Sequence, residues 1–261
     1  MAKIFKLLTL LLLCCCCKST IKESSQYVSK REVKAVGKTT RKKVTKKVLK
    51  VGVKTFDDLV ASGKYVIKGG TKRFKILTPD GKELARVVRT RKQTVVKALW
   101  VSKGANKSSL NSLLNLENLL PNTTYMANGG KYVTDAMARP IESSLPAFAK
   151  ADIVPRSAKM QREAVVKAVG KSRAKRYQGG HMIANSLGGI SEGINIVPQF
   201  ERVNKGTFAE IEGLVRKNRK YIKNYKVRNI YQGKSRIPKT QRITFELKGK
   251  KHSYFIANKS R

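Results

Sequence analysis

The fold of this chain is decided by the run Tyr177-Gln-Gly-Gly-His-Met-Ile-Ala-Asn-Ser-Leu-Gly-Gly189, followed by Asn195-Ile-Val-Pro-Gln-Phe-Glu-Arg-Val-Asn204 and then Glu212. His181, one of only two histidines in the chain, lies among glycines ahead of two asparagines and a glutamate. An imidazole titrates near neutral pH, and amide and carboxylate oxygens suit a hard divalent cation. Metal-assisted cleavage of a phosphodiester requires this combination of groups.

Apolar runs around this stretch predict two strands and a helix. Met182-Ile-Ala-Asn185 is typical of a short buried strand that starts at His181, and Ile194-Asn-Ile-Val-Pro198 of a second one. We expect Asn204 to cap the helix that follows. The core face of this helix would hold apolar residues at helical spacing, Phe208, Ile211, Leu214 and Val215. Glu212 lies eight residues after Asn204, about 80° around a continuous helix, so both side chains would face one cleft.

The remaining elements follow from periodicity and turn residues. Alternating runs in residues 62–100, with a turn at Pro79-Asp-Gly81, predict a small β-rich region. Residues 101–125 are rich in Ser, Asn and Leu and predict a helix with a linker. We expect a further helix at 158–169 and three strands in the tail, around 225–231, 241–247 and 253–256.

The charge of the chain points to its partners. Lys and Arg number 57 against 16 Asp and Glu, a formal net charge of +41. Such an excess favours nucleic acid or an anionic membrane surface and says little about the fold. In residues 126–261 the excess is 29 basic against 9 acidic residues. We expect these cations to divide between a phosphate-binding face and ordinary solvated surface.

The N-terminal residues predict export from the cytoplasm. Lys3 and Lys6 precede an apolar run that is too short to span a bilayer but suits a secretory signal, and Cys14 to Cys17 follow it. Residues 1–17 therefore predict a secreted protein or a cell-envelope lipoprotein, with membrane anchoring through an acylated cysteine. Residues 18–54 hold 13 Lys or Arg and 2 Glu. They predict a flexible basic tether, which either captures polyanions or is a solvated spacer.

Residues from about 132 to the C-terminus resemble the DNA/RNA non-specific endonucleases, in the bacterial branch of secreted and toxin-like proteins. The matching segments are Tyr132–Arg139, Gly180-His181, Gly188-Gly189, Asn195–Gln199, Asn204–Gly206 and Glu212. The resemblance implies an α+β fold, namely a ββα-metal (His-Me finger) nuclease core with an antiparallel sheet in residues 126–261. A small β-rich accessory region in residues 55–125 would precede it.

The resemblance assigns a role to each matching position. It makes His181 the general base that takes a proton from the attacking water. Asn204 would be the single direct protein ligand of Mg²⁺, with Mn²⁺ as an alternative. Asn195 and Glu212 would orient the site and hold the waters of the cation.

Two positions differ from the commonest motif of these endonucleases. That motif reads Asp-x-Gly-His, and many members have Asp-Arg-Gly-His. Here Gln178 replaces the aspartate and Gly179 replaces the arginine. The transition-state charge is then left to the metal or to another cation, for which Arg139, Arg173 and Arg176 are available.

The leading hypothesis is a metal-dependent, sequence-nonspecific endonuclease that acts on DNA, with RNA as a further substrate. A second hypothesis is a non-catalytic, basic nucleic-acid-binding protein whose nuclease site is degenerate at Gln178 and Gly179. A third makes the nuclease a toxin, which implies an acidic immunity or inhibitor protein as a partner. Cleavage separates the first hypothesis from the second, and a neighbouring immunity gene would favour the third.

Overall fold

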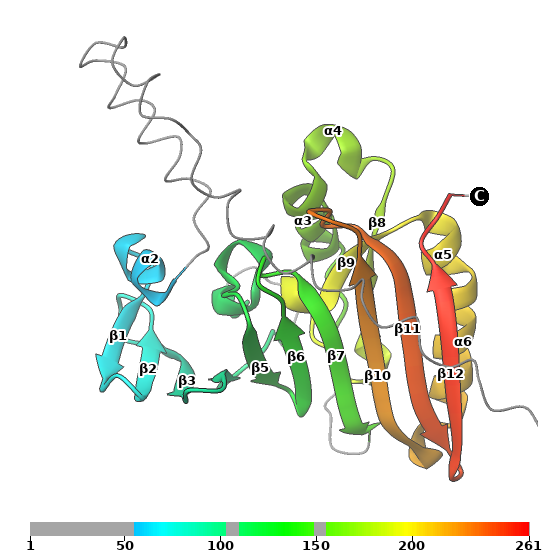
Figure 1. Ribbon diagram of the computed structural model, residues 1–261, viewed down its shortest axis with the longest axis horizontal. Helices are drawn as coiled ribbons and strands as arrows, with labels where there is room; N and C mark the ends of the chain where they lie inside the picture. The colour runs from blue at the N-terminus through cyan, green and yellow to red at the C-terminus, as the bar shows by residue number, and fades with distance from the viewer. Residues whose placement is uncertain (1–54, 103–109, 149–154, 261) are drawn as a thin grey trace, which may run out of the picture. The chain divides into compact units, whose positions relative to one another are not determined.

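The computed structural model describes residues 55–102, 110–148 and 155–260 (Figure 1). The expected targeting segment, residues 1–17, and the basic tether, residues 18–54, lie outside the described residues. Within the described part of the chain, no helix is long and apolar enough to cross a membrane.

Most of the described residues form a ten-stranded sheet in the order β1-β2-β3-β4-β5-β6-β7-β10-β11-β12. Every neighbouring pair is antiparallel except β4 and β5, which are parallel. The strands are β1 (Val66–Gly69), β2 (Arg73–Leu77), β3 (Glu83–Arg89), β4 (Thr94–Ala98), β5 (Thr123–Ala127), β6 (Gly130–Thr134), β7 (Pro140–Ala147), β10 (Ile222–Tyr231), β11 (Pro238–Leu247) and β12 (Lys250–Ala257).

Two tight hairpins set the register of this sheet. Asn128 and Gly129, with φ of 47° and 74°, join β5 to β6, and Lys248 and Gly249, with φ of 49° and 79°, join β11 to β12. Two consecutive positive φ values match the twist of antiparallel strands, which is why Asn-Gly is a favoured pair here. The three tail strands expected from the sequence are confirmed as β10, β11 and β12.

A second sheet and the helices lie on one side of the large sheet (Figure 1). The second sheet pairs β8 (Gln178–His181) with β9 (Ile196–Gln199) in antiparallel register. The helices are α2 (Phe56–Ala61), α3 (Ala158–Val169), α4 (Lys171–Ala174), α5 (Glu201–Lys205) and α6 (Thr207–Lys217). The mixed α+β class with a large, mostly antiparallel sheet is therefore as expected.

Aromatic side chains fill the core between the two layers. Tyr125, Tyr132 and Tyr225 project from the large sheet and are fully buried. Burying a side chain of this size stabilises the fold by about 1.5–3 kcal/mol. Across this interface Gln199 Nε2 donates a hydrogen bond to Gln241 Oε1 at 2.5 Å, so β9 is fixed against β11.

The helix expected at 158–169 is confirmed with these bounds as α3. Ser157 is its N-cap, and the Ser157 side chain accepts a hydrogen bond from the backbone N–H of Met160 at 3.3 Å. Such a cap satisfies one of the free amides at a helix start. The apolar face expected for α6 is confirmed too, since Phe208, Ile211 and Val215 are buried.

The expectation of a strand at Met182–Asn185 is wrong, because β8 ends at His181 and a loop with a 3-10 turn, η6 (Asn185–Leu187), follows. The Asn195 side chain explains the difference. Its Oδ1 accepts from Ile183 N at 3.0 Å, and its Nδ2 donates to Ile183 O at 2.8 Å. These bonds take the backbone groups that a strand partner would need, while the apolar side chains stay buried in the core.

Asn204 is not a helix cap, contrary to expectation. It lies inside the short helix α5, and α6 starts only after Gly206, whose backbone angles are φ −96° and ψ −115°. A continuous helical rotation therefore does not relate Asn204 to Glu212. Their relative placement depends on the break at Gly206.

Residues 101–125 form no regular α-helix in their described part. They contain two 3-10 turns, η3 (Ser112–Leu114) and η4 (Leu116–Asn118), and enter β5 at Thr123. Asn111 and Asn118 donate side-chain hydrogen bonds to backbone carbonyls. Such bonds offer the backbone an alternative to a helix.

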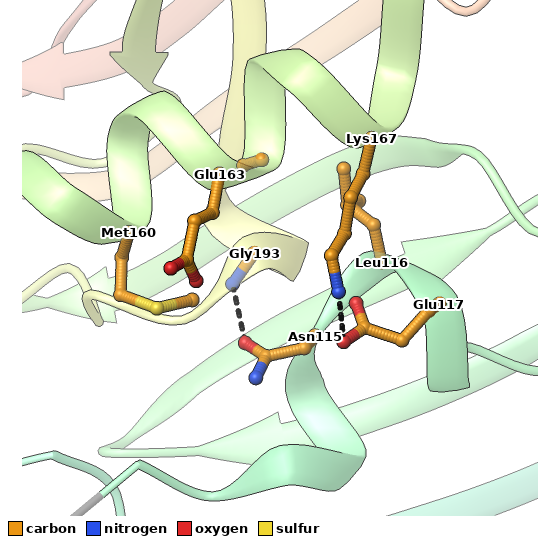
Figure 2. Close-up of a pocket in the computed structure, with 8 residues that line it drawn as sticks. Asn115, Leu116, Glu117, Met160, Glu163, Lys167 and Gly193 are labelled. Atoms are coloured by element: carbon orange, nitrogen blue, oxygen red, sulfur yellow. Dashed lines mark hydrogen bonds and ion pairs between the residues drawn. The ribbon is translucent and has the colours of Figure 1, made fainter. Parts of the chain in front are cut away.

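The expected boundary between residues 55–125 and 126–261 falls inside β5. Contacts join the two sides of this boundary: Gly193 N donates to Asn115 Oδ1 at 3.3 Å, and Lys167 of α3 forms an ion pair with Glu117 (Figure 2). Glu192, which is fully buried, accepts from the backbone N–H of Ser102 at 2.6 Å. Burial raises the pKa of its carboxyl group. The residues before β5 are thus part of the same core.

Candidate active site

Two glycines allow β8 to pack between α3 and β9. A Cβ atom at Gly179 would lie 2.6 Å from the backbone oxygen of Gln161 in α3. A Cβ atom at Gly180 would lie 1.7 Å from Gln199 Oε1 in β9. Real Cβ atoms do not approach this closely, so any side chain at either position would force the layers apart. The arginine of the commoner motif has no room at position 179 for this reason.

A hydrogen-bond network from α3 surrounds His181. Gln161 Nε2 donates to Gly179 O at 2.5 Å and lies 3.4 Å from His181 Nδ1. Arg156 Nε, just before the start of α3, donates to Gln161 Oε1 at 2.9 Å. The two bonds fix which end of the Gln161 amide faces the imidazole. Arg156, Gln161 and His181 thus form one connected group.

His181 is held neutral by its surroundings. Its side chain is buried, and its Nε2 atom makes no hydrogen bond with the described residues. Burial, with the nearby charge of Arg156, lowers the pKa of His181 from 6.5 to about 3. A neutral imidazole is the form that can accept a proton.

This burial predicts that acid destabilises the fold through His181. Between pH 6.5 and pH 3 the unfolded chain binds the proton more tightly, so stability falls as pH falls through this window. At pH 5 the loss is about 2 kcal/mol, or about 5 °C in Tm. Thermal melts at pH 7 and pH 5 should show a larger drop for the wild type than for His181→Asn. Equal drops in the two proteins would contradict the prediction.

The positive charge of Arg156 acts on Glu212 as well as on His181. Burial raises the pKa of Glu212 to about 7, against the opposing charges of Arg156 and Arg216. Arg156 also acts on His181, so one guanidinium lies within electrostatic reach of both groups. The Glu212 carboxylate forms no ion pair with the described residues, so it is available to an added cation.

Asn204 joins this region through Gln178 and shares no hydrogen bond with His181 among the described residues. Asn204 Nδ2 donates to Gln178 Oε1 at 2.8 Å. Gln178 occupies the aspartate position of the commoner motif, and this bond turns the Asn204 amide so that its nitrogen faces β8. Asn204 Oδ1 makes no hydrogen bond within the described part of the chain and is the atom available to a hard cation.

Asn195 is fully buried and bonded to the loop after His181. Besides its two bonds to Ile183, its Nδ2 donates to Ile190 O at 2.8 Å. Both N–H groups are therefore used by backbone carbonyls. In this structure Asn195 fixes the loop that leaves β8.

The donor set suits a cation held by one amide and water better than a cage of charged ligands. Among the residues that the structure describes, no group of three or more His, Cys, Asp or Glu side chains could hold a metal ion. A free amide oxygen at Asn204 and an unpaired carboxylate at Glu212 remain. Mg²⁺ keeps several waters in sites of this kind.

A family model matches the part of the chain that holds this site. The family model described as DNA/RNA non-specific endonuclease matches residues 121–249. The matched residues include every residue of the candidate site. A solved structure, "Structure of Sda1 nuclease with bound zinc ion", is 22% identical, with a TM-score of 0.30, over 32% of this chain and 39% of that chain. The chain thus spans well under half of that nuclease. No curated protein matches the chain.

The structure singles out a cation near the candidate site that the sequence did not reveal. Arg139, one of the three expected candidates, forms an ion pair with Asp135 at 2.6 Å. It also donates hydrogen bonds to the backbone carbonyls of Gly233 and Ser235. Arg173 and Arg176 are exposed in and after α4, and neither appears among the charges that act on His181 or Glu212. Arg156 is the arginine that acts on both.

Proposed function

We propose that this protein is a metal-dependent, sequence-nonspecific endonuclease that hydrolyses phosphodiester bonds of DNA, with RNA as a further substrate. The observation that carries the proposal is the shared position of Arg156. Its charge acts on both His181 and Glu212, inside the region that matches the endonuclease family. A base, a carboxylate and a guanidinium gathered in one region can act together on a phosphate.

In the proposed reaction, the neutral imidazole of His181 accepts a proton from water. The water oxygen attacks phosphorus, and the bond from phosphorus to the leaving 3′-oxygen breaks. In the free protein the pKa of His181 is low. A negatively charged phosphodiester bound beside His181 would raise this pKa and so make the imidazole a stronger base. Arg156 would bind the non-bridging oxygens, where negative charge develops.

Asn204 would hold the cation through Oδ1, with Glu212 orienting the coordinated waters. When bound there, Mg²⁺ or Mn²⁺ would polarise the phosphate and neutralise the leaving oxygen. Gln178 would keep Oδ1 directed at the cation by holding Nδ2. We propose on these grounds that β8, β9 and α5 form the ββα-metal motif.

Incubation of the full chain with plasmid and with total RNA tests the proposal directly. We expect nicking and then linearisation of the plasmid in Mg²⁺ or Mn²⁺, without preference for sequence, and no product in EDTA. Cleavage that persists in EDTA would remove the metal from the mechanism. Salt should inhibit strongly, because binding of the phosphate backbone releases counterions.

A second function is favoured by the burial of His181. A non-catalytic nucleic-acid-binding protein with a degenerate site would tolerate an imidazole whose pKa is about 3. It would shift DNA in a gel at low salt and yield no product in Mg²⁺ or Mn²⁺. That result would establish the second function.

For residues 1–17 we propose a role in export, to the medium or to the cell envelope as a lipoprotein. A nuclease outside the cytoplasm acts either as a scavenger or as a toxin. The toxin alternative requires an acidic immunity or inhibitor protein, which would complement the charge of +41. Fractionation of cells that express the full chain tests the proposed location.

A further inference from the structure

The large sheet has one face that no described helix covers. Side chains of alternate residues point to opposite faces of a strand. One face carries buried residues such as Tyr132 and Tyr225, which belong to the hydrophobic core. The opposite face, here called the outer face, carries mostly exposed or half-exposed side chains. Figure 1 shows α3, α5 and α6 on the far side of the sheet, so the outer face of β5 to β12 is bare among the described elements.

The strand register aligns the charges of the outer face into a single row across the sheet, here called the cationic row. Six of its ten positions are Lys or Arg, and none is acidic. The row runs through Lys68, Lys75, Arg86, Lys97, Met126, Lys131, Ser144, Lys226, Thr244 and Ser253. Each residue is the direct cross-strand partner of the next.

This arrangement costs stability. Like charges directly opposite each other on neighbouring strands are destabilising, and four successive positions, from Lys68 to Lys97, are all cations. Two carboxylates relieve part of the repulsion: Glu83 is 3.0 Å from Lys75 and 2.9 Å from Arg86, and Glu142 is 3.7 Å from Lys226. Glu142 also lies within 4 Å of Lys131 and Arg228, so one negative charge faces three positive ones. The six cations of the row thus face two carboxylates, which leaves a net charge of +4, and Lys68 and Lys97 form no ion pair with the described residues.

The dimensions of the row suit a nucleic acid. Neighbouring strands are about 4.8 Å apart, so ten strands extend the row over about 43 Å. That length corresponds to about 13 base pairs of duplex. The twist of a sheet bends such a path. A helical phosphate backbone can follow a bent path, whereas a flat bilayer would meet only part of it.

We propose that the cationic row is a second binding surface for the phosphate backbone of a nucleic acid, separate from the candidate active site. The sheet and its buried tyrosines separate the row from β8, so one phosphate cannot contact both. The row would hold a distant segment of a long substrate while another segment is bound at His181. The inference goes beyond the proposed cleavage and does not require it.

The test compares two variants of the full chain with equal net charge. The row variant replaces Lys68, Lys97, Lys131 and Lys226 with Gln. The control variant replaces four lysines outside the large sheet with Gln: Lys217, Lys220, Lys234 and Lys259. Binding of a 40-base-pair duplex is measured by fluorescence anisotropy in EDTA, between about 50 and 300 mM salt.

We expect the row variant to bind the duplex at least about 10-fold more weakly than the control variant does. The slope of log K against log salt concentration should be smaller in magnitude by about 3. Equal losses in the two variants would overturn the proposal and leave only a general effect of charge. A loss of binding to vesicles of anionic phospholipid without a loss for the duplex would overturn it in favour of a membrane. The Lys68/Lys97 and Lys131/Lys226 pairs are also tested separately, so that misfolding of one protein leaves the other as a test.

The assay separates this proposal from the proposed function. If wild-type protein cleaves plasmid and the row variant binds like the control, only the second surface fails. If wild-type protein cleaves nothing while the row variant loses binding, the second surface stands and the endonuclease assignment fails.

Discussion

Replacing His181 with Ala should lower the rate of plasmid nicking by about 10²–10⁴-fold, the usual contribution of a general base. The imidazole is neutral at pH 7, because burial lowers its pKa to about 3, and it lies 3.4 Å from Gln161 in the network that includes Arg156. The measurement is the initial rate of conversion of supercoiled plasmid at saturating Mg²⁺. Binding of duplex in EDTA should persist, since the cations remain.

The chain offers a matched control for this variant in its other histidine. His252 lies on β12, stacked on Phe245 with ring centroids 5.1 Å apart, on the strand at the far edge of the large sheet. His252→Ala should nick plasmid at the wild-type rate. Added imidazole should partly restore His181→Ala, because it can enter the space left by the ring. Full activity in His181→Ala would refute its role as the base.

Replacing Arg156 with Ala should lower kcat by about 10²–10³-fold, the range measured when one donor to a developing oxyanion is removed. The physical reason is that Gly179 leaves no side chain at the arginine position of the commoner motif, and Arg156 is the cation beside His181 and Glu212. Arg156→Lys should keep part of the activity, because it retains the charge and loses the planar fork of donors.

Arg173→Ala is the control, since Arg173 is an exposed arginine in α4. A purely structural role for Arg156, through its bond to Gln161, predicts a different pattern. Arg156→Gln could still bond Gln161 and would then keep full activity. The transition-state role predicts that Arg156→Gln is as inactive as Arg156→Ala. Arg156→Ala should also raise the pKa of His181, because it removes a positive charge that lowers it.

Local patterns in the sequence predicted the elements whose structure depends on their own residues. The helix at 158–169 has a serine cap and apolar residues at helical spacing, and the tail strands alternate and end in tight turns. The run Met182–Asn185 was misassigned because its apolar residues are buried in a loop. The hydrogen bonds that fix this loop come from the side chain of Asn195. Asn195 lies too far along the chain to be part of the local apolar pattern.

The same limit applies to the candidate site. The motif led to His181, Asn204 and Glu212, but their neighbours come from elements far away in sequence. Arg156 reaches the site only because α3 packs on Gly179, at a distance that excludes a side chain. In the sequence, only the two adjacent glycines, Gly179 and Gly180, indicate that another element packs closely here. The break at Gly206, likewise, cannot be inferred from apolar spacing.

The buried carboxylate of Glu192 has a consequence for how this protein can be divided into fragments. The family match starts at residue 121, yet Glu192 depends on amides at Ser102 and Asn111. A fragment cut at the family border would remove the amides of Ser102 and Asn111 from that carboxylate and open the edge of β5 to solvent. The region that matches the family is therefore not an independent folding unit, and any fragment, fusion or domain exchange would have to include the preceding strands.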